Sequence, residues 1–300
     1  MARKKKRRRS SRKKKQKLWN QLFTFAAAVA IVAFVLYLQR GEPLSHRKPR
    51  AVSRPQLKIA GARQIPARKL TGAPKIIFVI DDIGNTNLYT DDLEKLGSEV
   101  TYSILPLLRH TDFFDRFSLE TGAEVILHQP LESEKGTIPG PGLITTAMPD
   151  SFVLDELRRN LASVPHAVGI NNHMGSKGTA DPRLMNLILR ELKNRGLFFL
   201  DSKTTTHSVG QAVANHYQLR YLSRDEFLDN EDSVLAIKTE IAALAEKARW
   251  HGYAVGIGHY RPNTLQALAE EIPRLKRGGF QIVSLTDILE WKARGKYWSS

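Results

Sequence analysis

Two adjacent carboxylates, Asp81 and Asp82, end a short apolar run at residues 76–80 and are followed by Gly84. The run is too short for a helix and has the composition of a buried parallel strand. In α/β proteins the carboxyl ends of parallel strands open onto the active-site face. The pair is therefore suited to hold a metal ion and to act as a general base. The alternative is that one of them only caps the following helix near Asn85.

Three histidines, His128, His173 and His259, also follow closely after apolar runs. Because the ends of parallel strands converge on one face, we expect these side chains to meet there. Asp82, His128 and His173 then form a set of one carboxylate and two imidazoles, with open positions for water and substrate. A divalent ion in this set would lower the pKa of a bound water toward about 7. Alternatively, each histidine is a hydrogen-bonded core or rim residue.

The other strand ends supply groups that could act beside such an ion. Asp81 is a candidate general base, or a residue that holds the attacking water. His259 could protonate the leaving group or stabilise an oxyanion. Asp201 could orient His173 or His259 through the second ring nitrogen, as carboxylates behind metal ligands often do.

Five more polar residues near strand ends have a less specific signal. Candidate substrate contacts are Asn172, Ser176 and Arg261. Asp225 and Asp229 have two equally weighted interpretations, because such a pair can line a site or cap a turn or helix start.

The order of elements favours an α/β fold. From residue 71 onward, apolar runs of four to eight residues alternate with stretches of helical periodicity, such as residues 183–194 after Asp181 and Pro182. Alternation of this kind predicts a parallel sheet with helices outside, and seven or eight such units suggest a barrel.

The charge is unevenly distributed along the 300 residues. The formal net charge is +16, but the first 70 residues hold 21 of the 46 Lys and Arg and one of the 30 acidic residues. Residues 71–300 are therefore left with a net charge of −4. This distribution argues against a large basic nucleic-acid surface on the folded domain. The chain contains no cysteine, which excludes disulfides, thiolate nucleophiles and cysteine-ligated metals.

The amino-terminal part predicts a membrane anchor. Residues 1–17 form a basic tail, and residues 18–38 carry no charge and would span about 30 Å as a helix. The basic flank predicts a single-pass signal anchor in the cytoplasmic (inner) membrane, with the amino terminus in the cytoplasm and residues 71–300 in the periplasm. A cleaved signal peptide is the alternative. Residues 39–70 are expected to be a flexible linker, and the tail is expected to contact anionic lipid headgroups.

Six segments resemble the divergent polysaccharide deacetylase family, a distant branch of the NodB-like carbohydrate esterase superfamily. The Asn-Asn-His-Met-Gly-Ser motif at 171–176 is the most specific of them, and the full set is 79–84, 128–132, 169–176, 200–204, 224–229 and 258–262. The resemblance spans about residues 74–290. It implies a distorted (β/α) barrel of about seven strands, with zinc as the expected metal.

One motif departs from the better-known NodB-like enzymes. Those enzymes hold the metal with the second Asp of an Asp-Asp pair and two histidines spaced His-x-x-x-His, whereas Glu132 stands four residues after His128 here. Either Glu132 replaces a ligand or His173 supplies it, and His173 is preferred because imidazole suits zinc.

The expected function is metal-dependent hydrolysis of an envelope polysaccharide or peptidoglycan, by N- or O-deacylation of amino sugars. The alternative from another class is a non-catalytic carbohydrate-binding or scaffold protein that retains the fold. No nucleic-acid partner is expected.

Overall fold

The computed structural model describes residues 72–297, with side chains as far as residue 294. The basic tail, the membrane segment and the linker predicted at 1–17, 18–38 and 39–70 lie outside the described residues. Within 72–297, no helix combines the length and the apolar character needed to span a bilayer.

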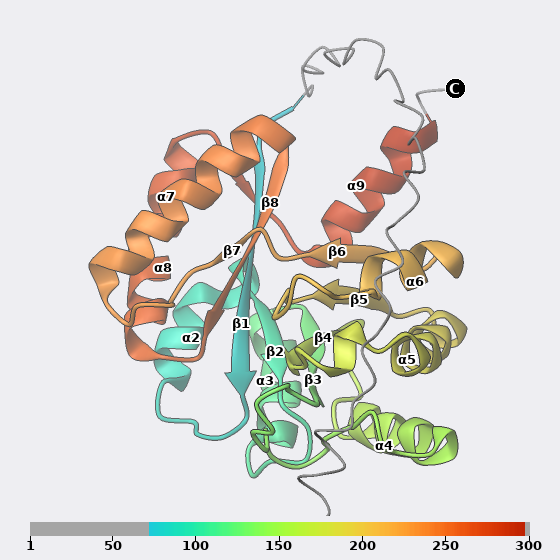
Figure 1. The fold of residues 1–300 in the computed structure, drawn as a ribbon. Helices are drawn as coiled ribbons and strands as arrows, with labels where there is room; N and C mark the ends of the chain where they lie inside the picture. Colours follow the sequence, from blue (N-terminus) through green and yellow to red (C-terminus); the bar gives the residue numbers. More distant parts are fainter. Residues whose placement is uncertain (1–71, 298–300) are drawn as a thin grey trace, which may run out of the picture. The chain divides into compact units, whose positions relative to one another are not determined.

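Residues 72–297 form one parallel sheet with helices packed against it (Figure 1). The strands are β1 (Lys75–Ile83), β2 (Thr101–Ile104), β3 (Val125–Leu131), β4 (Gly169–Met174), β5 (Phe198–Asp201), β6 (Tyr221–Ser223), β7 (Glu226–Phe227), β8 (Tyr253–His259) and β9 (Gln281–Ile282). The helices are α2 (Thr90–Leu96), α3 (Thr111–Thr121), α4 (Asp150–Ala162), α5 (Pro182–Arg195), α6 (Gly210–His216), α7 (Val234–His251), α8 (Pro262–Arg277) and α9 (Leu285–Tyr297).

The sheet is a curled half-barrel rather than a closed barrel. Its strand order is β6-β5-β4-β3-β2-β1-β8-β7, with β9 paired to the start of β1. The two edge strands, β6 and β7, are joined by only Arg224 and Asp225, so the sheet must curl until its edges approach each other. Two residues are too few for the crossover that parallel neighbours need, and no pairing between β6 and β7 is found in the described part of the chain. The prediction of an α/β barrel is therefore confirmed in its class and curvature, but the barrel does not close, and eight strands rather than about seven follow the curl.

Alternation along the strands separates two apolar layers. On β1, Ile76, Phe78 and Ile80 pack toward the outer helices, whereas Ile77 and Val79 face the interior of the curl. The interior layer also contains the first turns of α9, through Leu285, Ile288 and Leu289. Helix α9 therefore closes the end of the curl where the strands begin, and the carboxyl ends of the strands remain free to form a site (Figure 1).

Local signals set the ends of the helix that follows the His173 strand. Asp181 caps α5 by accepting a hydrogen bond from the backbone N–H of Leu184, and Pro182 occupies the first turn. Gly196 ends the helix in the left-handed conformation, at φ 71°. The predicted helix at 183–194 is confirmed.

Candidate metal centre

Both aspartates reach the mouth of the curl, for different reasons. Asp81 continues the interior-facing series Ile77, Val79, and it is buried. Asp82 would point outward if the strand stayed regular. Instead it adopts a left-handed backbone at φ 63°, and the register between β1 and β2 shifts between Ile80 and Ile83. Aspartate tolerates this conformation better than most residues, and the turn brings the second carboxylate to the same site.

Asp82, His128 and His173 are brought together as predicted. Oδ1 of Asp82 lies 3.2 Å from Nε2 of His128 and 3.0 Å from Nδ1 of His173. The two ring nitrogens lie 3.1 Å apart. Ligands bound at about 2.0–2.1 Å in tetrahedral geometry are separated by about 3.3 Å, so this spacing suits one divalent ion.

The hydrogen bonding of the group also fits a cation. Oδ1 of Asp82 is buried and has no hydrogen-bond partner among the described residues, although two imidazoles face it. A buried carboxylate oxygen without a donor is costly unless a positive charge compensates it. Burial favours the protonated form of Asp82, but His128 and His173 outweigh this effect and hold the pKa of Asp82 far below its usual value. The carboxylate is therefore ionised and available as a ligand.

Asn171 sets the orientation of His128. Its Nδ2 donates to Oδ1 of Asp81 at 2.8 Å, so its Oδ1 is the acceptor that faces Nδ1 of His128, also at 2.8 Å. Ser103 donates to the same Oδ1 at 2.8 Å. Nδ1 of His128 must therefore carry the proton, and Nε2 keeps the lone pair that a metal needs.

His259 stands on the other side of Asp82. Its Nε2 lies 3.8 Å from Oδ2 of Asp82. Its Nδ1 donates to Oδ1 of Asp229 at 2.9 Å, and Oδ2 of Asp229 accepts from the His259 backbone and from Thr264. Burial opposes protonation, but the hydrogen bond and charge of Asp229 outweigh it, so the pKa of His259 lies above its usual value. The arrangement favours an imidazolium directed at the mouth.

The carboxylate behind His259 is thus Asp229, not Asp201. Phe198 and Leu200 of β5 face the interior, so Asp201 has the opposite parity and points to the outer side. There its Oδ2 accepts from Ser208 at 2.6 Å and Tyr221 at 3.1 Å. The expectation that Asp201 orients His173 or His259 is wrong for this reason.

The three candidate substrate contacts have different surroundings. Asn172 is buried, and its amide binds the carbonyl of Met174 and the backbone N–H of Ser202, so it joins β4 to the segment after β5. Ser176 accepts from the backbone N–H of Glu134. Arg261 is the residue before helix α8, two positions after His259, and is half-buried.

Glu132 is occupied away from the metal group. Its carboxylate accepts from the backbone and hydroxyl of Thr146 and from Nζ of Lys177, each at 2.7 Å. The third member of the group of possible ligands is therefore His173, the alternative preferred from the sequence.

Several residues of the site were missed. Asn171, Ser103 and Ser202 form the polar layer beneath the ligands, with Nδ2 of Asn171 also donating to Ser202 at 3.2 Å. Each occupies a position that strict alternation along its strand assigns to the interior of the curl. Applying that alternation to β2, β4 and β5 would have predicted all three. Asp229 was named from the sequence as a residue that could line the site, but its pairing with His259 has no comparable signal, since it follows the two-residue strand β7.

Proteins similar in sequence were found in two bacteria. An uncharacterized protein of Haemophilus influenzae is 32% identical over 194 residues, which cover 65% of this chain and 69% of that protein. The uncharacterized protein YibQ of Escherichia coli is 28% identical over 203 residues, which cover 68% of this chain and 64% of YibQ. This chain therefore spans about two thirds of the length of each relative.

The fold and the sequence profile agree on the family. The crystal structure of the uncharacterized protein ATU2773 of Agrobacterium tumefaciens has a TM-score of 0.69 at 22% identity, covering 72% of this chain and 89% of that one. The two proteins share a fold. Residues 78–289, well over half of the chain, match the divergent polysaccharide deacetylase family. The chain belongs to that family.

Proposed function

We propose that this protein is a metal-dependent hydrolase that removes acyl groups from amino sugars of an envelope polysaccharide, by N- or O-deacylation. The observation that carries the proposal is the convergence of Asp82, His128 and His173 on one point, with a buried carboxylate, Asp81, and a carboxylate-backed imidazole, His259, beside it. Together these groups offer a metal site, a general base and a general acid, which a metal-dependent hydrolysis of an amide or ester uses.

The residues present would hold a divalent ion through Oδ1 of Asp82, Nε2 of His128 and Nδ1 of His173. When bound, such an ion, with zinc the one this donor set suits best, supplies an activated water at neutral pH and polarises the acyl carbonyl. Asp81 is the general base: its Oδ2 lies 3.6 Å from Nε2 of His128, and its Oδ1 is held by Asn171. Its burial and fixed orientation suit a group that takes a proton from water at the ligand cluster.

His259 acts as the general acid in this proposal. Asp229 holds Nδ1 and favours the protonated ring, so Nε2 carries a proton toward the mouth. That proton is transferred to the departing amine or alcohol as the acyl–heteroatom bond breaks. Asp81 and His259 flank Asp82 from different strands, β1 and β8, which are paired directly at Asp81 and His259.

Acetate release from N-acetylchitooligosaccharides and from peptidoglycan fragments tests the proposal. We expect release that a chelator abolishes and that added zinc restores, and we expect Asp81→Asn to bind zinc without releasing acetate. Saccharide binding that persists after chelation and in His128→Ala, with no acetate released from either substrate, would instead establish a non-catalytic carbohydrate-binding protein.

The cellular setting is also a proposal, and it rests on the sequence. The uncharged segment 18–38 after a basic tail supports a single-pass anchor in the cytoplasmic membrane, with anionic headgroups at the tail and the catalytic domain in the periplasm. If the domain is periplasmic, alkaline phosphatase fused after residue 71 should be active. An inactive fusion would place the domain in the cytoplasm.

A further inference from the structure

The outer helical layer is interrupted at the seam of the curl. Every other pair of consecutive strands from β1 to β9 is connected through an α-helix, whereas β6 and β7 are joined by two residues. The seam is therefore flanked by α6 on one side and α7 on the other, with no helix between them in the described chain.

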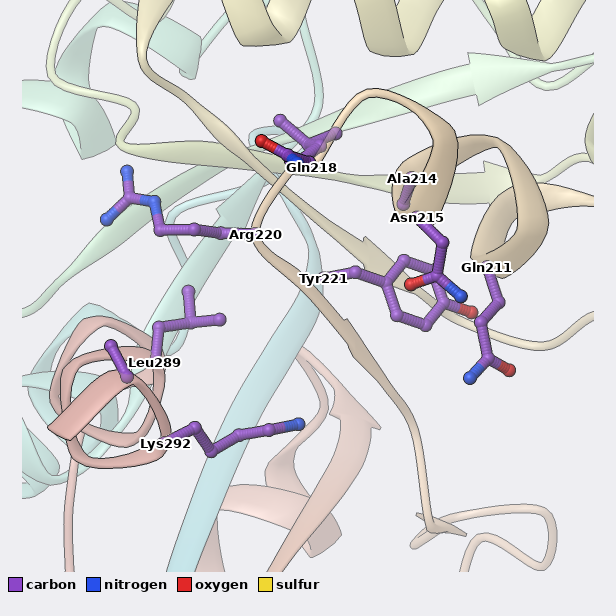
Figure 2. Close-up of a pocket in the computed structure, with 10 residues that line it drawn as sticks. Gln211, Ala214, Asn215, Gln218, Arg220, Tyr221, Leu289 and Lys292 are labelled. Carbon is purple, nitrogen blue, oxygen red and sulfur yellow. The ribbon is translucent and has the colours of Figure 1, made fainter. Parts of the chain in front are cut away.

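Two cavities lie on the α6 side of this seam. One, of about 760 Å³, lies between α6, β6 and α9. Figure 2 shows Leu289 and Lys292 of α9 across this cavity from Gln211 and Asn215 of α6. The other, of about 840 Å³, is lined by the segment after β5, by Arg224, and by the acidic residues Glu134, Asp201 and Asp225.

The two cavities share lining residues, and the second is linked by a hydrogen bond to the strand that carries His173. Gln211 and Tyr221 line both cavities. The Tyr221 hydroxyl donates a hydrogen bond to Oδ2 of Asp201. Thr204 lines the second cavity and is hydrogen-bonded to Asn172, the residue before His173. We call the two cavities together the seam groove.

The two cavities of the seam groove differ in charge: three acidic residues, Glu134, Asp201 and Asp225, line the second cavity, and none lines the first. Among the described residues, Lys203, Arg220, Arg224 and Lys292 form no ion pair. Arg220 donates to the carbonyl of Gly196 and Lys292 to the hydroxyl of Tyr253. Arg224 donates to the carbonyls of Ser202 and Lys203. The cavity between α6, β6 and α9 is lined by two of these cations and by no acidic residue.

The remaining lining suits a sugar chain. Gln211, Asn215 and Gln218 present amide donors and acceptors, and Tyr221 presents a half-buried aromatic ring. The second cavity adds the hydroxyls of residues 204–206 and Ser208. Amides and hydroxyls match the vicinal hydroxyls of a saccharide, whereas unpaired guanidinium and ammonium groups match a carboxylate.

We propose that the seam groove binds the part of the polysaccharide beyond the reacting sugar, and that this polymer carries carboxylates along its length. The inference rests on the proposed function for the site, and it names the substrate class as an acidic amino-sugar polymer. In this proposal Arg220 and Lys292 bind a carboxylate of a sugar placed away from the metal centre. Lys203 and Arg224 lie between that sugar and the metal centre.

A matched pair of saccharides tests the proposal. One is an N-acetylchitooligosaccharide, which is neutral. The other is a peptide-free peptidoglycan glycan of the same length, in which alternate sugars carry a lactyl carboxylate. Calorimetric titrations use the full chain carrying Asp82→Asn, so that turnover does not consume the ligand. We expect the acidic glycan to bind about tenfold more tightly than the neutral one, and the difference to shrink as NaCl is raised to 0.5 M.

Charge variants locate the effect. In Arg220→Gln/Lys292→Gln the preference for the acidic glycan should disappear, while Arg220→Lys/Lys292→Arg, which keeps both charges, should retain it. Thermal unfolding midpoints of the two double variants establish that both are folded. Equal affinity for the two glycans, or a preference that survives the Gln substitutions, would overturn the proposal.

Failure of this inference and failure of the proposed function are distinguishable. Metal content and acetate release from a short neutral chitooligosaccharide by the wild-type protein report on the metal centre. The preference between the two glycans reports on the seam groove. Acetate release without a preference refutes only the groove, and a preference without metal or acetate release refutes only the hydrolase.

Discussion

Asn171 fixes the protonation of His128. The amide oxygen of Asn171 accepts from Nδ1 of His128 at 2.8 Å, and the amide nitrogen of the same side chain donates to Asp81 at 2.8 Å. One neutral residue therefore orients both a candidate metal ligand and the candidate base. Such partners behind the ligands commonly matter almost as much as the ligands themselves.

Replacing Asn171 should therefore weaken metal binding. In Asn171→Leu, Nδ1 of His128 loses its acceptor, and Nε2 is no longer the sole unprotonated nitrogen. We expect the zinc dissociation constant to rise about 10- to 100-fold, measured by competition with a chromogenic chelator. Ser103→Ala, which removes a different donor to the same amide oxygen, should have a smaller effect. An unchanged affinity in Asn171→Leu would show that Asn171 does not orient His128.

The pH dependence of hydrolysis should report the Asp229–His259 pair. In the proposed mechanism His259 acts in its protonated form, and Asp229 raises the pKa of His259, so activity should persist above the usual histidine range and fall at higher pH. In Asp229→Asn the pKa of His259 falls, and the alkaline limb of kcat should move to lower pH by about 1 pH unit.

Asp225→Asn is the matched control for this shift. Asp225 lies four residues earlier, and its carboxylate accepts from the backbone of Val255 rather than from a ring nitrogen. In Asp225→Asn the alkaline limb of kcat should stay at the same pH as in the wild type. A limb that moves equally in both variants would mean that His259 is not the group being titrated.

Much of the fold and the ligand set follows from the sequence, because apolar runs of β-strand length mark the interior strands. The series Ile77, Val79, Asp81 shows how a simple alternation places the candidate base. The same alternation directs Asp201 away from the interior of the curl. Because the prediction did not apply it to β5, Asp201 was expected as a partner of His259 in place of Asp229. Asp82 is different, because its side chain reaches the site through a left-handed turn that neighbouring residue types do not reveal.

The sequence pattern also did not predict that the barrel would stay open. Strand–helix alternation suggests seven or eight units, but the two-residue link between β6 and β7 becomes visible as a seam only once the strand order is known. Short strands such as β7 have too few residues to show a period.

Glu132 should make stability depend on pH in the acid range. Partial burial favours its protonated form, but Lys177 and Thr146 outweigh this and lower its pKa to about 2, from an ordinary value of 4.5. The stabilisation is present above the unfolded pKa near 4.5 and is lost as the pH falls from there toward 2. Glu132→Gln should reduce the free energy of unfolding by about 1 kcal/mol at pH 7.

Urea denaturation at pH 7 and at low pH measures this difference. The wild type and Glu132→Gln should converge as the pH approaches 2, because the native carboxyl is then protonated. Metal content of the variant at pH 7 should match the wild type, since Glu132 is outside the ligand group. A gap in stability that stays constant down to pH 2 would contradict the role assigned to its charge.

Gly169 at the start of β4 should tolerate no side chain. A Cβ at this position would lie 2.5 Å from the ring of Phe198, which is fully buried. Gly169→Ala should therefore lower the free energy of unfolding by about 1–3 kcal/mol, and Phe198→Leu in the same chain should recover part of that loss. Additive losses in the double variant, measured by urea denaturation, would show that the ring contact is not the cause.

Metal stoichiometry is the most direct test of the claim that one divalent cation is coordinated by Asp82, His128 and His173. Elemental analysis should find about one equivalent of metal in the purified wild-type protein. Asp82→Asn should lose it, and Asp201→Asn, whose carboxylate points to the outer side of the sheet, should keep it. Equal metal content in the wild type and in Asp82→Asn would contradict the account.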